Sequence, residues 1–86
     1  MDVFLTKNFS KQYQKLPQRL QEKVEERLGL FSLNPFDTTL RNHALKGSRK
    51  GSWSINITGD YRALYTVQDD TAIFIAIGTH AELYRT

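Results

Sequence analysis

The chain has no cysteine among its 86 residues. This absence excludes disulfide bonds, thiolate metal ligands and a cysteine nucleophile. No run of apolar residues approaches the length that crosses a bilayer. The first seven residues contain a short apolar stretch with an acidic residue and no small-residue cleavage site, a pattern that is not typical of a secretory signal. We therefore expect a cytoplasmic protein that does not bind membranes.

The motifs of several enzyme classes are also missing. The sequence has no glycine-rich phosphate loop, no pair of histidines at metal-binding spacing, no cluster of acidic metal ligands and no nucleophile elbow. Residues 47–51 are basic and bounded by glycines, but their order is not that of a nucleotide-binding loop. The sequence thus predicts neither a metal nor another cofactor.

The size and composition predict one domain over residues 1–86. Hydrophobic residues make up 40% of the chain, which is enough for one modest core. No internal repeat, low-complexity tract or linker interrupts it.

The first half of the chain predicts a strand and two helices. Residues 2–6 are typical of a short strand, and Asn8 or Ser10 is expected to cap a first helix. Pro17 suits the first turn of a second helix, which should end at residues 34–35 because a residue before proline disfavours helical geometry. The apolar positions at helical spacing are Phe9, Tyr13 and Leu16, then Leu20, Val24, Leu28 and Phe31.

The second half predicts three strands joined by short turns. Residues 53–57 alternate between apolar and polar side chains, as in a half-buried strand. Turns at residues 59–60 and 69–70 separate this segment from strands at 61–67 and 72–77, the last covered on both faces. Gly78 should end the last strand, and Thr79 should cap a single helical turn that reaches Tyr84.

This order, β-α-α-β-β-β, predicts an α+β domain in which a helix pair packs on one face of an antiparallel sheet. The opposite face is then free for function. If Ile55 and Ile57 face the helices, alternation places Asn56 and Arg62 together on the free face.

The charge is distributed unevenly. The net charge is +3, and no acidic residue lies between Asp37 and Asp60. The basic residues of this segment are Arg41, Lys46, Arg49 and Lys50. Such a cluster favours a polyanion or an acidic partner, although a solvated loop is an equally simple explanation.

Residue types suited to RNA cleavage are present. When the RNA 2′-hydroxyl attacks the neighbouring phosphate, the reaction needs a base, an acid and positive charge. His43 and His80 suit the first two roles, because histidine ordinarily titrates near neutrality. Arg62 suits the third, because a guanidinium matches phosphate oxygens in paired hydrogen bonds. The alternative for each histidine is an ordinary surface or packing role.

Other side chains have two plausible roles each. Asp60 could orient a histidine or act as a base, or it could simply form a turn with Gly59. Tyr61, Tyr84 and Trp53 could stack on unpaired bases. The alternating pattern favours a core position for Trp53, and Tyr84 could equally anchor the end of the chain.

The motifs NHALKG at residues 42–47, WSI at 53–55 and GDYRALY at 59–65 together resemble the RelE/ParE toxin superfamily. The ending IGTHAELY, residues 77–84, is similar to the YafQ-type branch of mRNA interferases, and the likeness covers nearly the whole chain. The resemblance implies a RelE-like toxin that enters the ribosomal A site and cuts mRNA without a metal, leaving a cyclic phosphate and a 5′-hydroxyl. It also implies a cognate antitoxin that covers the basic surface, and a toxin–antitoxin complex on operator DNA.

By position, the resemblance implies a role for each matching residue. His80 would be the general acid, and His43 would contact phosphate or assist proton transfer. Asp60 would be a possible base, Arg62 would stabilise the phosphate, and Tyr84 would stack on the substrate. The predicted substrate-binding residues are Lys46, Arg49, Lys50, Tyr61 and Tyr84.

Three positions depart from the YafQ pattern. Asn56 stands in place of a histidine, Ala76 in place of an arginine and Tyr61 in place of a tryptophan. Two alternatives therefore stay open: a non-enzymatic ParE-like inhibitor of DNA gyrase, and a degenerate toxin that only binds its antitoxin. The two histidines favour the nuclease.

Overall fold

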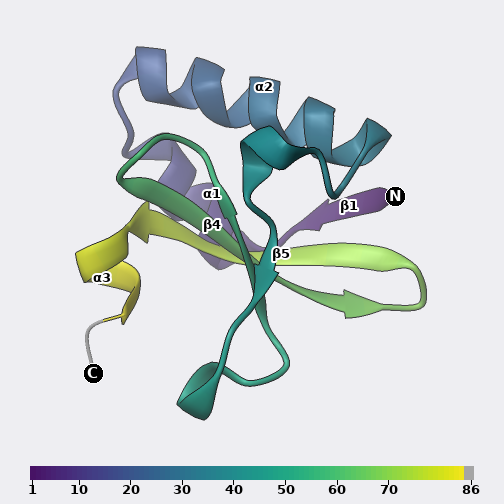
Figure 1. Ribbon diagram of the computed structural model, residues 1–86. Coiled ribbons are helices and arrows are strands. Elements are labelled where there is room, and N and C mark those ends of the chain that lie inside the picture. Colours follow the sequence, from purple (N-terminus) through teal and green to yellow (C-terminus); the bar gives the residue numbers. More distant parts are fainter. Residues whose placement is uncertain (85–86) are drawn as a thin grey trace.

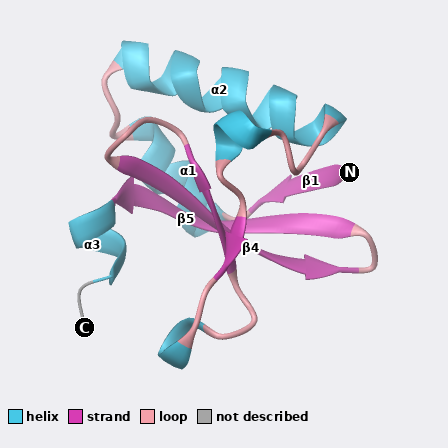
Figure 2. Ribbon diagram, viewed as in Figure 1, coloured by secondary structure: helices cyan, strands magenta, loops and turns pink. Residues whose placement is uncertain are grey.

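The computed structural model describes residues 1–84, in which one sheet carries two helices on one face (Figure 1). Among these residues, no helix is both long and apolar enough to cross a membrane. The elements are β1 (Asp2–Leu5), α1 (Lys7–Gln14), α2 (Gln18–Leu33), β2 (His43–Ala44), β3 (Trp53–Asn56), β4 (Tyr61–Gln68), β5 (Thr71–Thr79) and α3 (His80–Tyr84). Two 3-10 turns, η1 (Thr38–Leu40) and η2 (Gly47–Arg49), flank β2, and the loop with η2 extends away from α2 (Figure 2).

The predicted α+β fold is confirmed, with a correction to the sheet. The strand order is β1-β5-β4-β3-β2, and β3, β4 and β5 form the expected antiparallel hairpins. However, β1 pairs with β5 in parallel, so the sheet is mixed. Two helices follow β1 before the next strand, and no tight turn obliges it to run antiparallel to its neighbour.

The first helix begins earlier than predicted. Thr6, and neither Asn8 nor Ser10, is its N-cap: the Thr6 hydroxyl accepts a hydrogen bond from the Phe9 amide and donates one to the Phe74 carbonyl. Asn8 instead donates to the carbonyl of Ile75, over 2.8 Å. The second helix begins directly after Pro17 and ends before Asn34, as expected.

The core lies between the helix pair and one face of the sheet. Phe31 of α2 packs edge-on against Tyr65 and Phe74, with ring centroids 5.0 and 5.3 Å apart. Ile55 and Ile57 are buried in the same cluster. Trp53 also faces this side and stacks on Tyr65, in agreement with its predicted core position. The Ile-rich face thus meets the helices, and the other face is left for the site.

Replacing Phe31 with alanine should remove the centre of this aromatic cluster. Because Phe31 is 0% exposed, we expect the free energy of unfolding to fall by about 3–5 kcal/mol. Leu33→Ala on the same helix is the matched control, since Leu33 is 88% exposed and its loss should change stability by less than about 0.5 kcal/mol. Denaturant titration of both variants measures the difference, and equal midpoints would contradict this description of the core.

Candidate active site

Strand pairing aligns one row of side chains across the free face of the sheet. Asn56 on β3 is opposite Arg62 on β4, and Arg62 is opposite Gly78 on β5. Directly opposed residues share a face, and this row alternates with the buried row of Ile55 and Ala63. The prediction that Asn56 and Arg62 share the free face is therefore confirmed.

A second row brings His43 to the same face. His43 on β2 pairs with Ser54, Ser54 pairs with Leu64, and Leu64 pairs with Ala76. Leu64 is two residues from Arg62 on the same strand, so Arg62 and Ala76 face the same side. Arg62 therefore lies on the same face of the sheet as Ala76, the position at which the YafQ pattern has an arginine.

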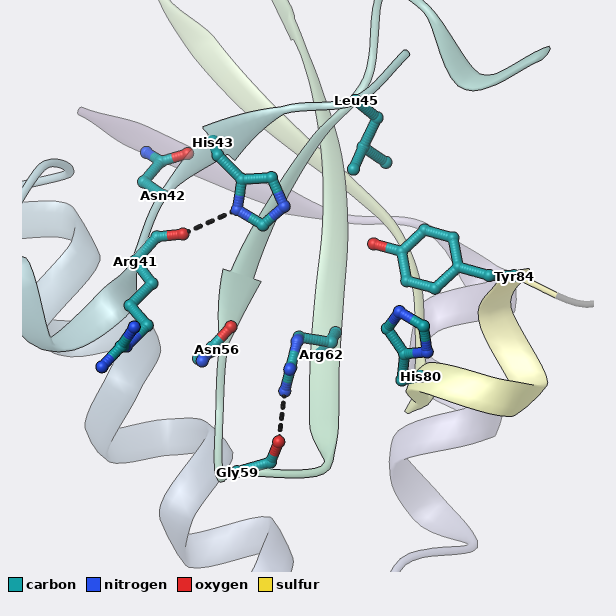
Figure 3. A pocket seen from close by; sticks show the side chains of 9 residues that line it. All are labelled: Arg41, Asn42, His43, Leu45, Asn56, Gly59, Arg62, His80 and Tyr84. Carbon is teal, nitrogen blue, oxygen red and sulfur yellow. Dashed lines mark hydrogen bonds between the residues drawn. The ribbon is translucent and has the colours of Figure 1, made fainter. Parts of the chain in front are cut away.

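His43, Asn56 and Arg62 from these rows, together with α3, line an open pocket of about 900 Å³. Figure 3 shows His43, Arg62 and His80 around one hollow, although they come from β2, β4 and α3. Two arginines and no carboxylate are among the side chains of the described chain that line it, so the pocket favours anions. The lining residues are Arg41, Asn42, His43, Leu45, Asn56, Gly59, Arg62, His80 and Tyr84.

The backbone before His43 fixes the orientation of its imidazole. Arg41 adopts a left-handed conformation with φ of 48°, and its carbonyl lies 2.8 Å from His43 Nδ1 (Figure 3). A carbonyl only accepts, so Nδ1 must carry the hydrogen. In the neutral imidazole the lone pair is then on Nε2, which has no partner among the described residues. His43 is therefore arranged to accept a proton at Nε2.

The turn between β3 and β4 fixes the guanidinium of Arg62. Its Nη1 donates to the carbonyls of Thr58, at 3.2 Å, and Gly59, at 2.7 Å. The hydrogens on Nε and Nη2 have no partner within residues 1–84, and they can bind the oxygens of an anion as a pair.

A capping box positions the two aromatic rings of α3. The Thr79 hydroxyl accepts from the Glu82 amide at 3.1 Å, and a Glu82 carboxylate oxygen accepts from the Thr79 amide at 2.7 Å. This confirms Thr79 as the predicted cap. His80 and Tyr84 lie one turn apart, with ring centroids separated by 4.5 Å. The buried Leu83 anchors the helix, so Tyr84 lines the pocket beside His80.

Arg49 joins the β2–β3 loop to α3. Its Nη2 donates to the carbonyl of Leu83, and the guanidinium carbon lies 6.0 Å from the centroid of the Tyr84 ring. This contact links the loop after His43 to the helix that carries His80. Lys46 and Lys50 are exposed and do not line the pocket.

Asp60 and Tyr61 lie outside this pocket. They line a separate pocket of about 440 Å³ together with Arg19, Leu20, Lys23 and Thr58. The backbone carbonyl of Asp60 nevertheless accepts a hydrogen bond from the His80 amide at 3.0 Å. Asp60 thus contacts the site through its main chain.

Asn42 and Leu45 line the pocket but were not predicted, and Arg41 was identified only as part of the basic cluster. Their adjacency to His43 in sequence is the one signal that could have pointed to them. Within residues 1–84, no group of three or more His, Cys, Asp or Glu side chains is arranged to hold a metal ion.

Comparison with known proteins identifies relatives along almost the whole chain. A family model described as the YafQ bacterial toxin of type II toxin–antitoxin systems matches residues 1–85. Toxin YoeB from Escherichia coli strain K12 is 29% identical over 68 residues, which are 79% of this chain and 81% of YoeB.

Solved structures agree with this match. The crystal structure of YafQ from E. coli strain BL21(DE3) has a TM-score of 0.81 at 25% identity, and the match covers 96% of this chain and 97% of that one. A chain of the E. coli DinJ–YafQ toxin–antitoxin complex has a TM-score of 0.78 at 25% identity, covering 96% of both chains.

Removing the cap of α3 should loosen one side of the pocket. Thr79→Ala deletes the hydroxyl that accepts from Glu82, which should destabilise this helical turn by about 1 kcal/mol. Hydrogen exchange of the α3 amides should accelerate, while that of the β4–β5 hairpin should stay unchanged. Thr71→Ala, at the far end of β5, is the control. Unaltered exchange in α3 would show that the capping box does not hold this helix.

Proposed function

We propose that this chain, which belongs to the YafQ family of toxins from type II toxin–antitoxin systems, is an endoribonuclease that cuts mRNA on the ribosome. One observation carries the proposal: His43, Arg62 and His80, from three separate elements, line a single pocket that two arginines and no carboxylate line within the described residues. These are the groups that transesterification of RNA requires, and the ribosome presents mRNA in an extended, single-stranded form.

In the proposed reaction the 2′-hydroxyl attacks the adjacent phosphorus while His43 Nε2 takes the hydroxyl proton. The bond to the 5′-oxygen breaks, and the His80 imidazolium gives that oxygen a proton. The products are a 2′,3′-cyclic phosphate and a 5′-hydroxyl. Arg62 binds the non-bridging oxygens with its free N–H groups, and this stabilises the charge that develops on phosphate.

The other predicted residues support this centre in different ways. Tyr84 stacks on a base next to the cleaved bond, and Arg49 holds Tyr84 in place. Lys46 and Lys50 contact RNA phosphates outside the pocket. Asp60 positions His80 through its carbonyl, while Tyr61 contacts RNA that extends beyond the pocket. Asn56 contributes amide donors but cannot take a proton, so cleavage is slower than a histidine at position 56 would allow.

The partners follow from the same surface. The E. coli DinJ–YafQ complex pairs a similar fold with its antitoxin. A cognate antitoxin of this chain would cover the pocket and the exposed lysines near it, and the complex would bind operator DNA. The free toxin would act in the cytoplasm, where the ribosomes are.

Substituting His80 should abolish cutting without unfolding the protein. His80 is exposed, and loss of a general acid ordinarily reduces a rate by about 100-fold or more. Induced expression followed by mapping of mRNA 5′ ends should show codon-spaced cuts for the wild type and for Gln14→Ala, an exposed control on α1, but not for His80→Ala. Growth arrest with intact mRNA and damaged DNA would contradict the proposal in favour of gyrase inhibition.

The role of Arg62 in phosphate binding can be tested with two variants that separate its positive charge from the geometry of its paired donors. Arg62→Gln removes both, and cleavage by purified protein on programmed ribosomes should fall about 100-fold. Arg62→Lys keeps the charge but loses the paired donors, so its rate should fall between those of Arg62→Gln and the wild type. Equal rates for all three proteins would exclude Arg62 from phosphate binding.

A further inference from the structure

Asn42 connects the segment before His43 to two distant parts of the fold. Its Nδ2 donates to the carbonyl of Pro35 at 2.9 Å, and its Oδ1 accepts from the Tyr65 hydroxyl at 2.8 Å. The bond to Pro35 assigns the nitrogen and oxygen of the Asn42 amide, because a carbonyl only accepts and its partner must be Nδ2. Asn42 therefore joins the chain immediately before His43 to the segment between α2 and η1, and to β4.

Backbone pairing alone holds this segment weakly. β2 is only two residues long, and its register with β3 consists of two residue pairs, His43 with Ser54 and Ala44 with Trp53. It is also the last strand of the sheet, so no strand within residues 1–84 pairs with its outer edge. A short edge strand of this kind opens easily, and the hydrogen bonds of Asn42 are additional restraints on it.

Tyr65 is a rigid support for those restraints. The residue is 3% exposed, and its ring packs against Phe31, Trp53 and Phe74 with centroids 5.0, 6.4 and 5.1 Å away. Burial raises the pKa of the Tyr65 phenol above its ordinary value, although the bond to Asn42 opposes this shift. The hydroxyl therefore stays protonated at neutral pH and remains a donor. This hydroxyl is the atom through which Tyr65 contacts Asn42.

We infer that Tyr65 is a positioning residue, whose hydroxyl acts through Asn42 to hold His43 in the orientation that leaves Nε2 open to substrate. An effect of Tyr65 on the rate of RNA cleavage rests on the proposed function, whereas its effect on the orientation of the His43 imidazole does not. Because Tyr65 is 23 residues from Asn42 and faces the core, its sequence position gives no sign of this role.

Tyr65→Phe tests the inference by deleting one oxygen and keeping the ring in the core. The chain has 2 histidines, so the imidazole nitrogen spectrum contains two sets of signals, which His80→Ala assigns. The wild type should show His43 protonated at Nδ1. In Tyr65→Phe the His43 signals should shift toward those of a freely rotating imidazole, while those of His80 stay in place. Cleavage should fall roughly tenfold, as expected for a misplaced proton acceptor.

Tyr13→Phe is the matched control. Tyr13 also donates its hydroxyl to a side chain, Glu25 of α2, but it lies outside the pocket. This variant should change neither the His43 signals nor cleavage. If Tyr65→Phe fails to fold, Asn42→Ala breaks the same link from the pocket side, together with the bond to Pro35, and is judged by the same spectra.

His43 signals that stay at their wild-type positions in the folded variant would overturn the inference, whatever happens to activity. A wild-type protein that does not cut RNA would instead contradict the proposed function, and the imidazole spectra would still decide the role of Tyr65. Shifted His43 signals combined with slower cleavage would support both.

Discussion

The antiparallel pairing of β4 with β3 on one side and β5 on the other determines which side chains reach each face of the sheet. It aligns Ile55, Ala63 and Ile77 toward the helices, and it aligns Asn56, Arg62 and Gly78 on the opposite face. A slip of one residue would exchange these rows and expose the isoleucines to water. Burial of the core therefore also selects the register that brings Arg62 to the pocket.

Much of this arrangement could be predicted from the sequence because the alternation of side chains in β3 and β4 is a local pattern. The direction of β1 could not, because no hairpin joins it to its neighbour. The sequence did not predict β2, because a strand of two residues is too short to show an alternation of apolar and polar side chains. In β5 a register shift follows the pairing of Leu64 with Ala76, so Phe74 and Ile77 face the core although they are three residues apart. Because this part of the sequence is a continuous apolar run, no change in alternation marks the position of the register shift.

The site was predictable in its residue types and only partly in its geometry. His43, Arg62, His80 and Tyr84 were predicted, and all four line one pocket. Asp60 is two residues from Arg62, yet it lines another pocket and lies in the turn before β4 rather than in the strand. The role of Asn42 depends on a contact with Tyr65 that only the folded chain creates. Proximity in sequence to Arg62 thus does not by itself place a residue in the pocket.

The charge of the pocket bears on which departure from the YafQ pattern would matter most for the proposed phosphate chemistry. With Ala76 on β5, the arginines that line the pocket within residues 1–84 are Arg41 and Arg62. Arg41 is exposed, so solvent and salt weaken its field. Arg62 is held by two carbonyls and directs its remaining donors as a pair, and a preorganised group of this kind stabilises developing charge without having to reorient. A phosphodiester in this pocket would therefore depend on Arg62 for the stabilisation that an additional arginine on β5 could otherwise share.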